Sequence, residues 1–213
     1  MKKLACAVAL GFAVLGAQSA TIPFGVQNDV SSATVAGWGF TECHSSVYGS
    51  SGQSVASLLS SCGAGGDTLM MAARRTGSQV FEVLAAASFA DVTVDTGFDN
   101  VTHSANGVEW YFNNDWSWGF AGAGDAVNRT SCDTNGSVWT GGNERDRLCW
   151  HTGGGTLQGG WRAGNFIELN SSQDWERVLL VANANNNVPE PAGLALVGLA
   201  LAGAAVARRT KRA

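Results

Sequence analysis

Two acidic side chains, Glu109 and Asp115, flank a tryptophan-rich stretch of this 213-residue chain. They have the residue types with which glycosidases act, one carboxyl group as the acid and the other as nucleophile or base. His151, together with a serine or an aspartate, has the groups of a hydrolase. The sequence contains no Gly-x-Ser-x-Gly elbow, His-Glu-x-x-His helix or phosphate-binding loop that would support either chemistry. We therefore expect a protein without catalytic residues, and a secreted carbohydrate-active hydrolase that uses acidic residues is the alternative.

Aromatic side chains offer a second kind of chemistry, because a flat ring can stack on the C–H face of a sugar. The chain has eight tryptophans. Trp110, Trp116 and Trp118 stand at strand-alternating positions, and we expect them in the core. Trp139 and Trp161 stand in glycine-rich polar segments, which makes them the candidate glycan contacts.

Possible metal ligands are present without a convincing spacing. Asp133, Asn135 and Ser137 place oxygen-bearing side chains at alternate positions, as the front of a calcium loop does, but the cation Arg145 stands nearby. The cysteines lack the close Cys-x-x-Cys spacing of a zinc site. We expect no metal and no cofactor.

Four cysteines, Cys43, Cys62, Cys132 and Cys149, lie between the two ends of the chain. An even number in an oxidising compartment predicts two disulfides, for which three connectivities exist. We favour Cys43–Cys62 and Cys132–Cys149, because each pair encloses a Gly/Ser-rich or Gly/Asn-rich stretch that needs tethering. By chain entropy each closed loop would contribute about 3 kcal/mol.

The elements that must position these residues are expected to be mainly strands. Val108–Phe112 and Trp116–Phe120 alternate, and the turn-forming Asn113–Asp115 between them predicts an antiparallel hairpin with four aromatic groups on one side. Further strands are expected at Thr68–Ala73, Gln79–Ala86, Val92–Asp95, Arg147–His151, Gly160–Ala163 and Glu176–Ala182.

One helix is indicated behind a possible Ser54 cap, where the apolar residues from Val55 to Cys62 recur at helical spacing. Many short strands and one short helix predict an all-β fold. It would be mainly an antiparallel β-sandwich, with a jelly-roll-like connectivity as one possibility.

The N-terminus has the pattern of a signal peptide. The basic Met1–Lys3 precedes an apolar run at Leu4–Gly16 and small residues at Ala17 and Ser19, so we expect cleavage after Ser19. Residues 1–19 would then be removed by signal peptidase after export through the Sec translocon, leaving an ectodomain at 20–187.

The C-terminal residues 188–213 have three parts. Pro189, Glu190 and Pro191 precede 16 uncharged, mostly apolar residues at 192–207. As a helix at about 1.5 Å per residue, this run covers roughly 24 Å against a hydrocarbon core of roughly 30 Å, which predicts a single, marginal transmembrane helix. A basic cluster then ends the chain at Arg208, Arg209, Lys211 and Arg212. By the positive-inside rule this cluster stays in the cytoplasm and the ectodomain faces the periplasm.

This tripartite tail resembles the PEP-CTERM sorting signal of Gram-negative bacteria. The resemblance implies that exosortase, an integral-membrane protease, recognises the Pro-Glu-Pro tripeptide of a precursor held transiently in the inner membrane. It also implies a host that produces exopolysaccharide. Arg147–Thr152 and Gly160–Gly164 look like phrases found in other proteins with this tail, which implies a shared ectodomain but transfers no activity.

Charge excludes some partners. Residues 20–187 contain 16 acidic side chains, seven arginines and no lysine, a net charge of −9. Nucleic acid and anionic membrane surfaces require cation-rich proteins, so neither is expected as a partner of the ectodomain. We expect an exported protein of the cell surface or extracellular matrix, sorted by exosortase, that is structural or contacts exopolysaccharide.

Overall fold

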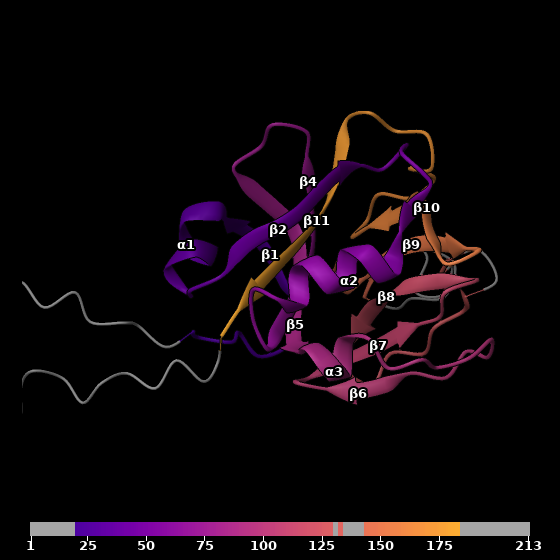
Figure 1. Cartoon of the computed structure of the whole chain (residues 1–213), viewed down its shortest axis with the longest axis horizontal. Helices are drawn as coiled ribbons and strands as arrows, with labels where there is room; N and C mark the ends of the chain where they lie inside the picture. The colour runs from indigo at the N-terminus through magenta and orange to yellow at the C-terminus, as the bar shows by residue number, and fades with distance from the viewer. Residues whose placement is uncertain (1–19, 130–131, 134–142, 184–213) are drawn as a thin grey trace, which may run out of the picture. The chain divides into compact units, whose positions relative to one another are not determined.

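The computed structural model describes residues 20–129, 132–133 and 143–183, which form two antiparallel sheets (Figure 1). The first sheet has five strands in the order β1-β5-β4-β11-β2. Their bounds are β1 Gln27–Ser31, β5 Val80–Ser88, β4 Thr68–Arg75, β11 Trp175–Ala182 and β2 Thr41–Val47. The central strand β4 is buried along almost its whole length, because side chains cover both faces of the sheet.

The second sheet has six strands in the order β3-β10-β9-β8-β7-β6. Their bounds are β3 Gln53–Ser54, β10 Thr156–Ala163, β9 Leu148–Gly153, β8 Ser117–Gly122, β7 Val108–Phe112 and β6 His103–Ala105. Strands β6 to β10 follow one another in the chain and lie side by side, which is a meander. This order differs from the two Greek keys of a jelly roll, so the jelly-roll possibility is wrong.

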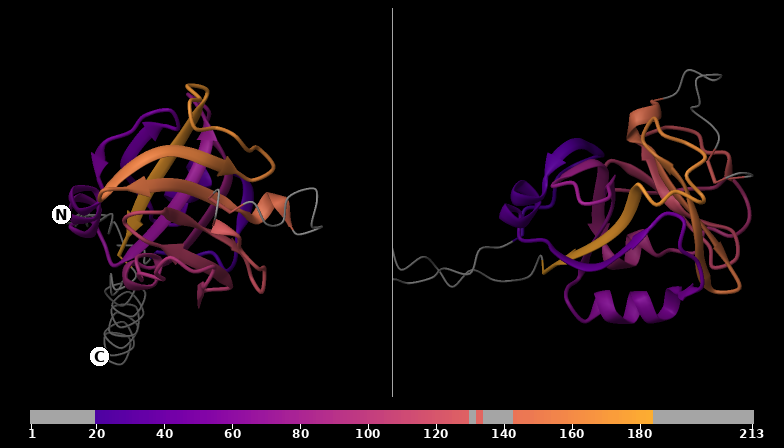
Figure 2. Two further views of the ribbon diagram at one scale, coloured as in Figure 1. Left: turned by 90° about the vertical axis from the view of Figure 1, so that its right-hand side faces the viewer. Right: turned by 90° about the horizontal axis from the view of Figure 1, so that it is seen from above.

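The two sheets share one core. Trp110 and Phe112 of β7 stand opposite Phe120 and Trp118 of β8, which confirms the expected hairpin with four aromatic groups on one side. The opposed rings pack edge to face, with 5.3 and 5.2 Å between their centroids. These rings pack with the inward side chains of β4, β5 and β11. The strands of one sheet cross those of the other (Figure 2, left).

The helices are short, and each α-helix that the structure describes buries apolar side chains against the sheets. Helix α2 (Val55–Gly63) begins as expected, with the Ser54 hydroxyl accepting a hydrogen bond from the Ser57 N–H. The structure also contains α1 (Ser32–Gly37), α3 (Phe89–Val92) and the 3-10 turn η2 (Glu144–Asp146), so the expectation of one short helix was too low.

The strand that we expected at Val92–Asp95 is not formed: α3 ends at Val92, and Asp95 makes only an isolated β-bridge with Phe112. Ser88 caps this helix, because its hydroxyl accepts a hydrogen bond from the Asp91 N–H at 3.1 Å. The apolar alternation of Val92 and Val94 was misleading: Val92 is buried at the end of the helix, and Val94 is exposed.

The remaining expected strands correspond to β4, β5, β9, β10 and β11, although Gln79 and Arg147 lie just before β5 and β9. Strands β1, β2, β3 and β6 were missed. All four are edge strands, and none of their residues is fully buried. Their polar sequences therefore lack the alternation by which a strand is recognised.

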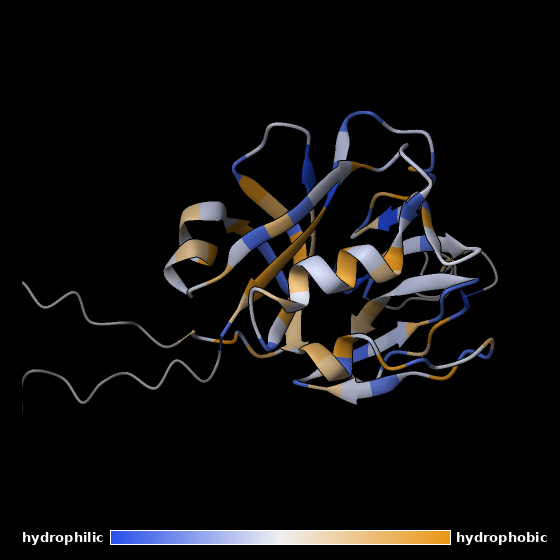
Figure 3. Cartoon of the chain, viewed as in Figure 1, coloured by the Kyte–Doolittle hydropathy of each residue, from blue (hydrophilic) through white to orange (hydrophobic). Residues whose placement is uncertain are grey.

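The outer faces of the two sheets are covered differently. On the five-stranded sheet, Met70, Leu84 and Val178 belong to an apolar cluster that α1 and the segment from Ala20 complete. Most of β11 is accordingly orange, the colour of hydrophobic residues, in Figure 3. On the six-stranded sheet, a smaller cluster around Tyr111 and Cys149 is covered by the segment after β8.

Two disulfides tether the domain in the connectivity that we favoured. Cys43 of β2 is bonded to Cys62 of α2, and Cys132 is bonded to Cys149 of β9. None of the helices within residues 20–129, 132–133 and 143–183 has the length and hydrophobicity that a membrane span requires. The expected signal peptide, the Pro-Glu-Pro motif, the apolar run at 192–207 and the basic cluster lie outside those residues. The boundaries at 19 and 187 stay predictions.

Candidate functional site

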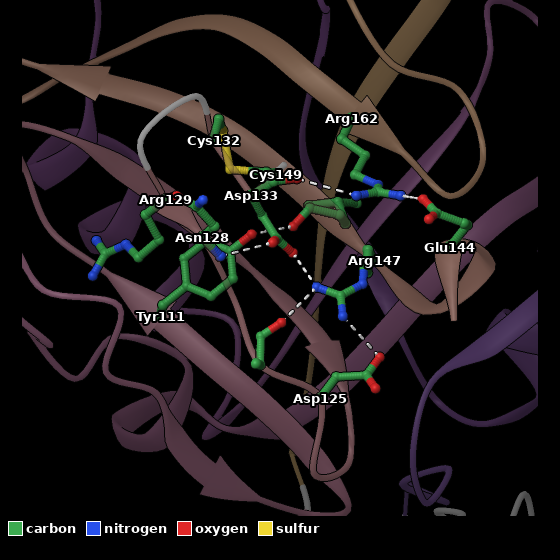
Figure 4. Close-up of polar contacts among 12 residues, drawn as sticks. Tyr111, Asp125, Asn128, Arg129, Cys132, Asp133, Glu144, Arg147, Cys149 and Arg162 are labelled. Atoms are coloured by element: carbon green, nitrogen blue, oxygen red, sulfur yellow. Dashed lines mark hydrogen bonds and ion pairs between the residues drawn. A yellow bond between two sulfur atoms is a disulfide. The ribbon is translucent and has the colours of Figure 1, made fainter. Parts of the chain in front are cut away.

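The outer face of the six-stranded sheet holds an unusual group of charged side chains. Arg129, Arg147, Arg162 and Asp133 are each at most 1% exposed. We call these four residues the arginine cluster (Figure 4). Arginine and aspartate are almost never fully buried unless they are paired, so their partners decide what the cluster does.

Arg147, just before β9, makes the most strongly buried ion pair. Its Nη1 atom donates to a carboxylate oxygen of Asp133 at 2.8 Å, and its Nη2 atom lies 3.1 Å from the carboxylate of Asp125. Burial raises the pKa of Asp133, and the charge of Arg147 and a hydrogen bond from the Asn128 N–H oppose that shift. The pair ties the segment after β8 to the sheet.

Arg162 of β10 reaches the same segment from the neighbouring strand. It forms an ion pair with Glu144 of η2 and donates to the backbone oxygens of Gly164 and Asp133, at 3.0 and 3.1 Å. Burial lowers the pKa of Arg162, and the charge of Asp133 acts in the opposite direction.

The backbone at Cys132 and Asp133 is shaped to make these contacts. Both residues have positive φ, 58° and 57°. This left-handed region costs a non-glycine residue about 1 kcal/mol or more. The disulfide to Cys149 and the ion pair to Arg147 hold the two residues there together. A disulfide and a buried ion pair therefore act on adjacent residues.

Arg129 is held mainly by neutral groups. Its guanidinium donates to the Ser117 hydroxyl at 2.9 Å and to the backbone oxygens of Gly97 and Asp99. It also lies 5.2 Å from the ring centre of Tyr111 and 4.6 Å from that of Trp116. Burial lowers the pKa of Arg129.

Tyr111 shows why this face contains a glycine. A Cβ atom added at Gly119, its cross-strand partner, would lie 2.6 Å from the Tyr111 hydroxyl. The glycine lets the ring lie flat on β8, where the hydroxyl donates to the Leu148 carbonyl at 3.1 Å. Of the arginine cluster, Arg129 lies over this ring.

Of the three tryptophans that we expected in the core, two are buried there and one is not. Trp110 and Trp118 are buried there, but Trp116 is only half-buried and stands just before β8. Its indole contacts Arg129 and Phe98 instead of the core. The expectation of core burial for Trp116 was therefore wrong.

The two candidate glycan contacts stand differently. Trp161 is half-buried and packs beside the Cys132–Cys149 disulfide, with its ring 6.3 Å from that of His151. Burial lowers the pKa of His151. Trp139 lies outside the described residues. Glycan contact by either tryptophan stays a prediction.

The acidic pair considered for catalysis is not brought together. Glu109 of β7 accepts hydrogen bonds from the hydroxyls of Thr102 and Ser104, both at 2.7 Å, and from the Gly124 N–H. Asp115 lies in the turn beyond the far end of β7 and accepts from the Gly154 N–H at 2.7 Å. The two carboxylates therefore have separate partners at the two ends of the strand.

A shallow depression of about 300 Å³ adjoins η2. It is lined by Asn28, Glu82, Arg145, Ala163, Gly164, Asn165 and Phe166. Among the described residues, no three His, Cys, Asp or Glu side chains are grouped as metal ligands. Asp133, the first residue of the calcium-like spacing, faces Arg147.

The arginine cluster was missed by the sequence analysis. A signal existed in the composition, because residues 20–187 contain seven arginines and no lysine. Arginine is the cation best suited to buried pairs and to stacking on rings. The partners Asp133 and Glu144 lie only 14 and 18 residues from Arg147 and Arg162, but they stand outside the regular strands, where no periodic pattern indicates which side chains meet.

Comparison with known proteins identifies the tail. Residues 187–212 match the PEP-CTERM protein-sorting motif. The chain thus carries the sorting motif that the tail resembled, and this motif marks an exported protein that is anchored in the membrane and then sorted by exosortase. Neither the search of curated proteins nor the search of solved structures found a match.

Proposed function

We propose that the two-sheet domain is a non-catalytic module of the cell surface or extracellular matrix that contacts exopolysaccharide. The observation that carries the proposal is the PEP-CTERM motif at residues 187–212, joined to a domain with two disulfides. Disulfides persist in oxidising compartments outside the cytoplasm, which agrees with delivery to the surface. Cleavage at Pro189–Pro191 would release the domain from its membrane-held precursor.

The chemistry of the domain supports a matrix role. With a net charge of −9 over residues 20–187, its surface suits neither nucleic acid nor anionic lipid. The carboxylate of Glu109 has three hydrogen-bond donors around it, and that of Asp133 is buried against Arg147. These acids act as structural acceptors, which favours a binding module over a hydrolase.

The sorting step is tested by replacing Pro189 and Pro191 with alanine. We expect the full-length precursor to stay in the inner-membrane fraction, whereas the unaltered protein matures and leaves it. The chain's third proline offers a matched control, because Pro23→Ala should mature normally. Normal maturation of the double variant would refute processing at this tripeptide.

The exopolysaccharide contact is tested by co-sedimentation of the mature protein with the exopolysaccharide secreted by the producing bacterium. We expect the protein to sediment with the polymer without releasing reducing sugar. Release that is abolished by Glu109→Gln would show a hydrolase instead. No sedimentation and no release would contradict the proposed contact.

A further inference from the structure

Phe98 and Trp116 form a solvent-facing pair of rings at the turn end of the β7–β8 hairpin. Phe98 is 63% exposed. Its ring stacks on the Trp116 indole, with 6.1 Å between the centroids and 26° between the planes. We call these two residues the aromatic platform. A large exposed aromatic ring in a stacked pair offers a flat apolar face, which is the surface that a sugar ring recognises.

The loop that carries Phe98 is held firmly in place. One Asp95 carboxylate oxygen accepts from the Gly97 N–H at 2.8 Å and from the Asn113 side chain at 3.0 Å. The Thr96 N–H donates to the Phe112 carbonyl at 2.9 Å, which fastens the loop to the end of β7.

Arg129 holds the same loop from the buried side. It donates to the backbone oxygens of Gly97 and Asp99, and its own N–H donates to the Asn100 side chain at 2.9 Å. Because Arg129 also lies 4.6 Å from the centre of the Trp116 ring, one side chain positions both halves of the platform. A pre-organised site loses less conformational entropy on binding.

The surroundings of the platform supply polar groups. Asp99 and Asn100 follow Phe98, and Asn114 and Asp115 precede Trp116; all four residues are exposed. Carboxylate and amide groups beside a flat ring are the partners that sugar hydroxyls require. The carboxylates of Asp99 and Asp115 also repel anions, so this rim suits an uncharged sugar better than a uronic acid.

We propose that the aromatic platform binds a pyranose ring of a neutral polysaccharide, with Phe98 stacked on the C–H face of the sugar. The proposal rests on the proposed function and gives it a site and a ligand class. Arg129 acts as a positioning residue beneath the platform.

The test separates the neutral and acidic fractions of the producing bacterium's exopolysaccharide by anion exchange. Retention of the mature protein is then measured by affinity electrophoresis in gels that contain each fraction. Phe98→Ala removes the ring, and Phe98→Leu keeps an apolar side chain without a flat face. Phe24→Ala is the matched control, because Phe24 is 76% exposed and lies against Gly107, at the opposite end of β7.

We expect the unaltered protein and Phe24→Ala to bind the neutral fraction. Both Phe98 variants should bind about tenfold more weakly, which corresponds to about 1.4 kcal/mol and lies within the range for one stacked aromatic contact. Their thermal midpoints should match that of Phe24→Ala, because an exposed ring contributes little to folding.

The other outcomes are distinct. Full binding by Phe98→Ala would overturn the platform and leave the proposed function intact. Full binding by Phe98→Leu would overturn the stacking, and binding to the acidic fraction alone would overturn the neutral ligand. If the unaltered protein binds neither fraction, the proposed function fails, and this inference fails with it.

Discussion

The outer faces of the two sheets are covered by different physical means. On the five-stranded sheet, Phe81, Leu84 and Val178 pack under α1 in an apolar cluster. On the six-stranded sheet, Tyr111 and Cys149 lie under a segment that Arg147 and Arg162 tie down through carboxylates and backbone oxygens. One face excludes water with hydrocarbon, and the other buries charges that must find partners.

This difference affects how uniquely the covering segment is positioned as well as how stable the fold is. An apolar cover tolerates exchanges between apolar side chains of similar volume, because burial has no fixed direction. A buried ion pair fixes its donors and acceptors in space, but removing one partner leaves the other charge without compensation. We call the outer face of the six-stranded sheet the polar face and that of the five-stranded sheet the apolar face. We infer that the polar face holds the segment after β8 in a single conformation. It should also be the face on which single substitutions interact most strongly.

Replacing Arg147 by methionine should give the largest effect. Asp133 is fully buried, so its charge would remain without its partner, and we expect a loss of about 3–5 kcal/mol in the free energy of unfolding. Urea denaturation of the oxidised protein measures this. Adding Asp133→Asn should restore part of the loss, because asparagine is neutral and tolerates the positive φ at this position.

Leu84→Ala is the matched substitution on the apolar face. Leu84 is fully buried, and we expect a loss of about 2–4 kcal/mol from cavity formation. This loss should simply add to that of Arg147→Met, since the two residues belong to different clusters. If Asp133→Asn failed to improve Arg147→Met, the cost at the polar face would not come from an unpaired charge.

The two disulfides give a further test of the comparison between the two faces, with a smaller expected difference. The Cys43–Cys62 and Cys132–Cys149 pairs span 19 and 17 residues, so chain entropy predicts nearly equal contributions of about 3 kcal/mol each. We expect the alanine double variant of Cys132 and Cys149 to lose roughly 1 kcal/mol more than that of Cys43 and Cys62, because Asp133 adjoins Cys132. Thermal unfolding of both variants measures the difference. Equal losses would mean that the disulfide and the arginine cluster act independently.

Local patterns in the sequence predicted the elements that local contacts stabilise. The β7–β8 hairpin followed from Asn113–Asp115 between two alternating runs, and α2 followed from Ser54 and a helical repeat. The disulfides followed from the composition of the enclosed loops. In each case a recognisable residue type or repeat marks both partners: turn residues between alternating runs, a cap before a helical repeat, or two cysteines 19 or 17 residues apart.

The candidate sites could not be predicted in this way. Arg129 reaches Thr96 and Gly97, which lie 33 and 32 residues before it, through a loop whose course no local pattern indicates. Trp116 alternates correctly with Trp118, yet β8 begins only at Ser117. The indole therefore lies outside the regular strand, and it pairs with Phe98 and Arg129. Tertiary contacts decided both outcomes.

Acid should weaken the polar face through Glu109, with the smallest effect of these predictions. Glu109 shares the outward side of β7 with Tyr111. Burial acts to raise the pKa of Glu109, but hydrogen bonds from Ser104, Thr102 and the Gly124 N–H outweigh it and lower the pKa. A lowered folded-state pKa means that the carboxylate stabilises the fold above its unfolded pKa of about 4.3. This contribution is lost as the pH falls through the folded-state value.

Glu109→Gln should therefore cost about 1 kcal/mol at neutral pH and almost nothing well below pH 4. Urea unfolding of both proteins across this pH range gives the difference. Ser104→Ala removes one of the donors, so it should raise the pKa of Glu109, which an NMR titration of the side-chain carboxyl would follow directly. A difference between the two proteins that stays constant from pH 7 to pH 3 would mean that packing, rather than charge, makes Glu109 important. The polar face would then resemble the apolar one at this position.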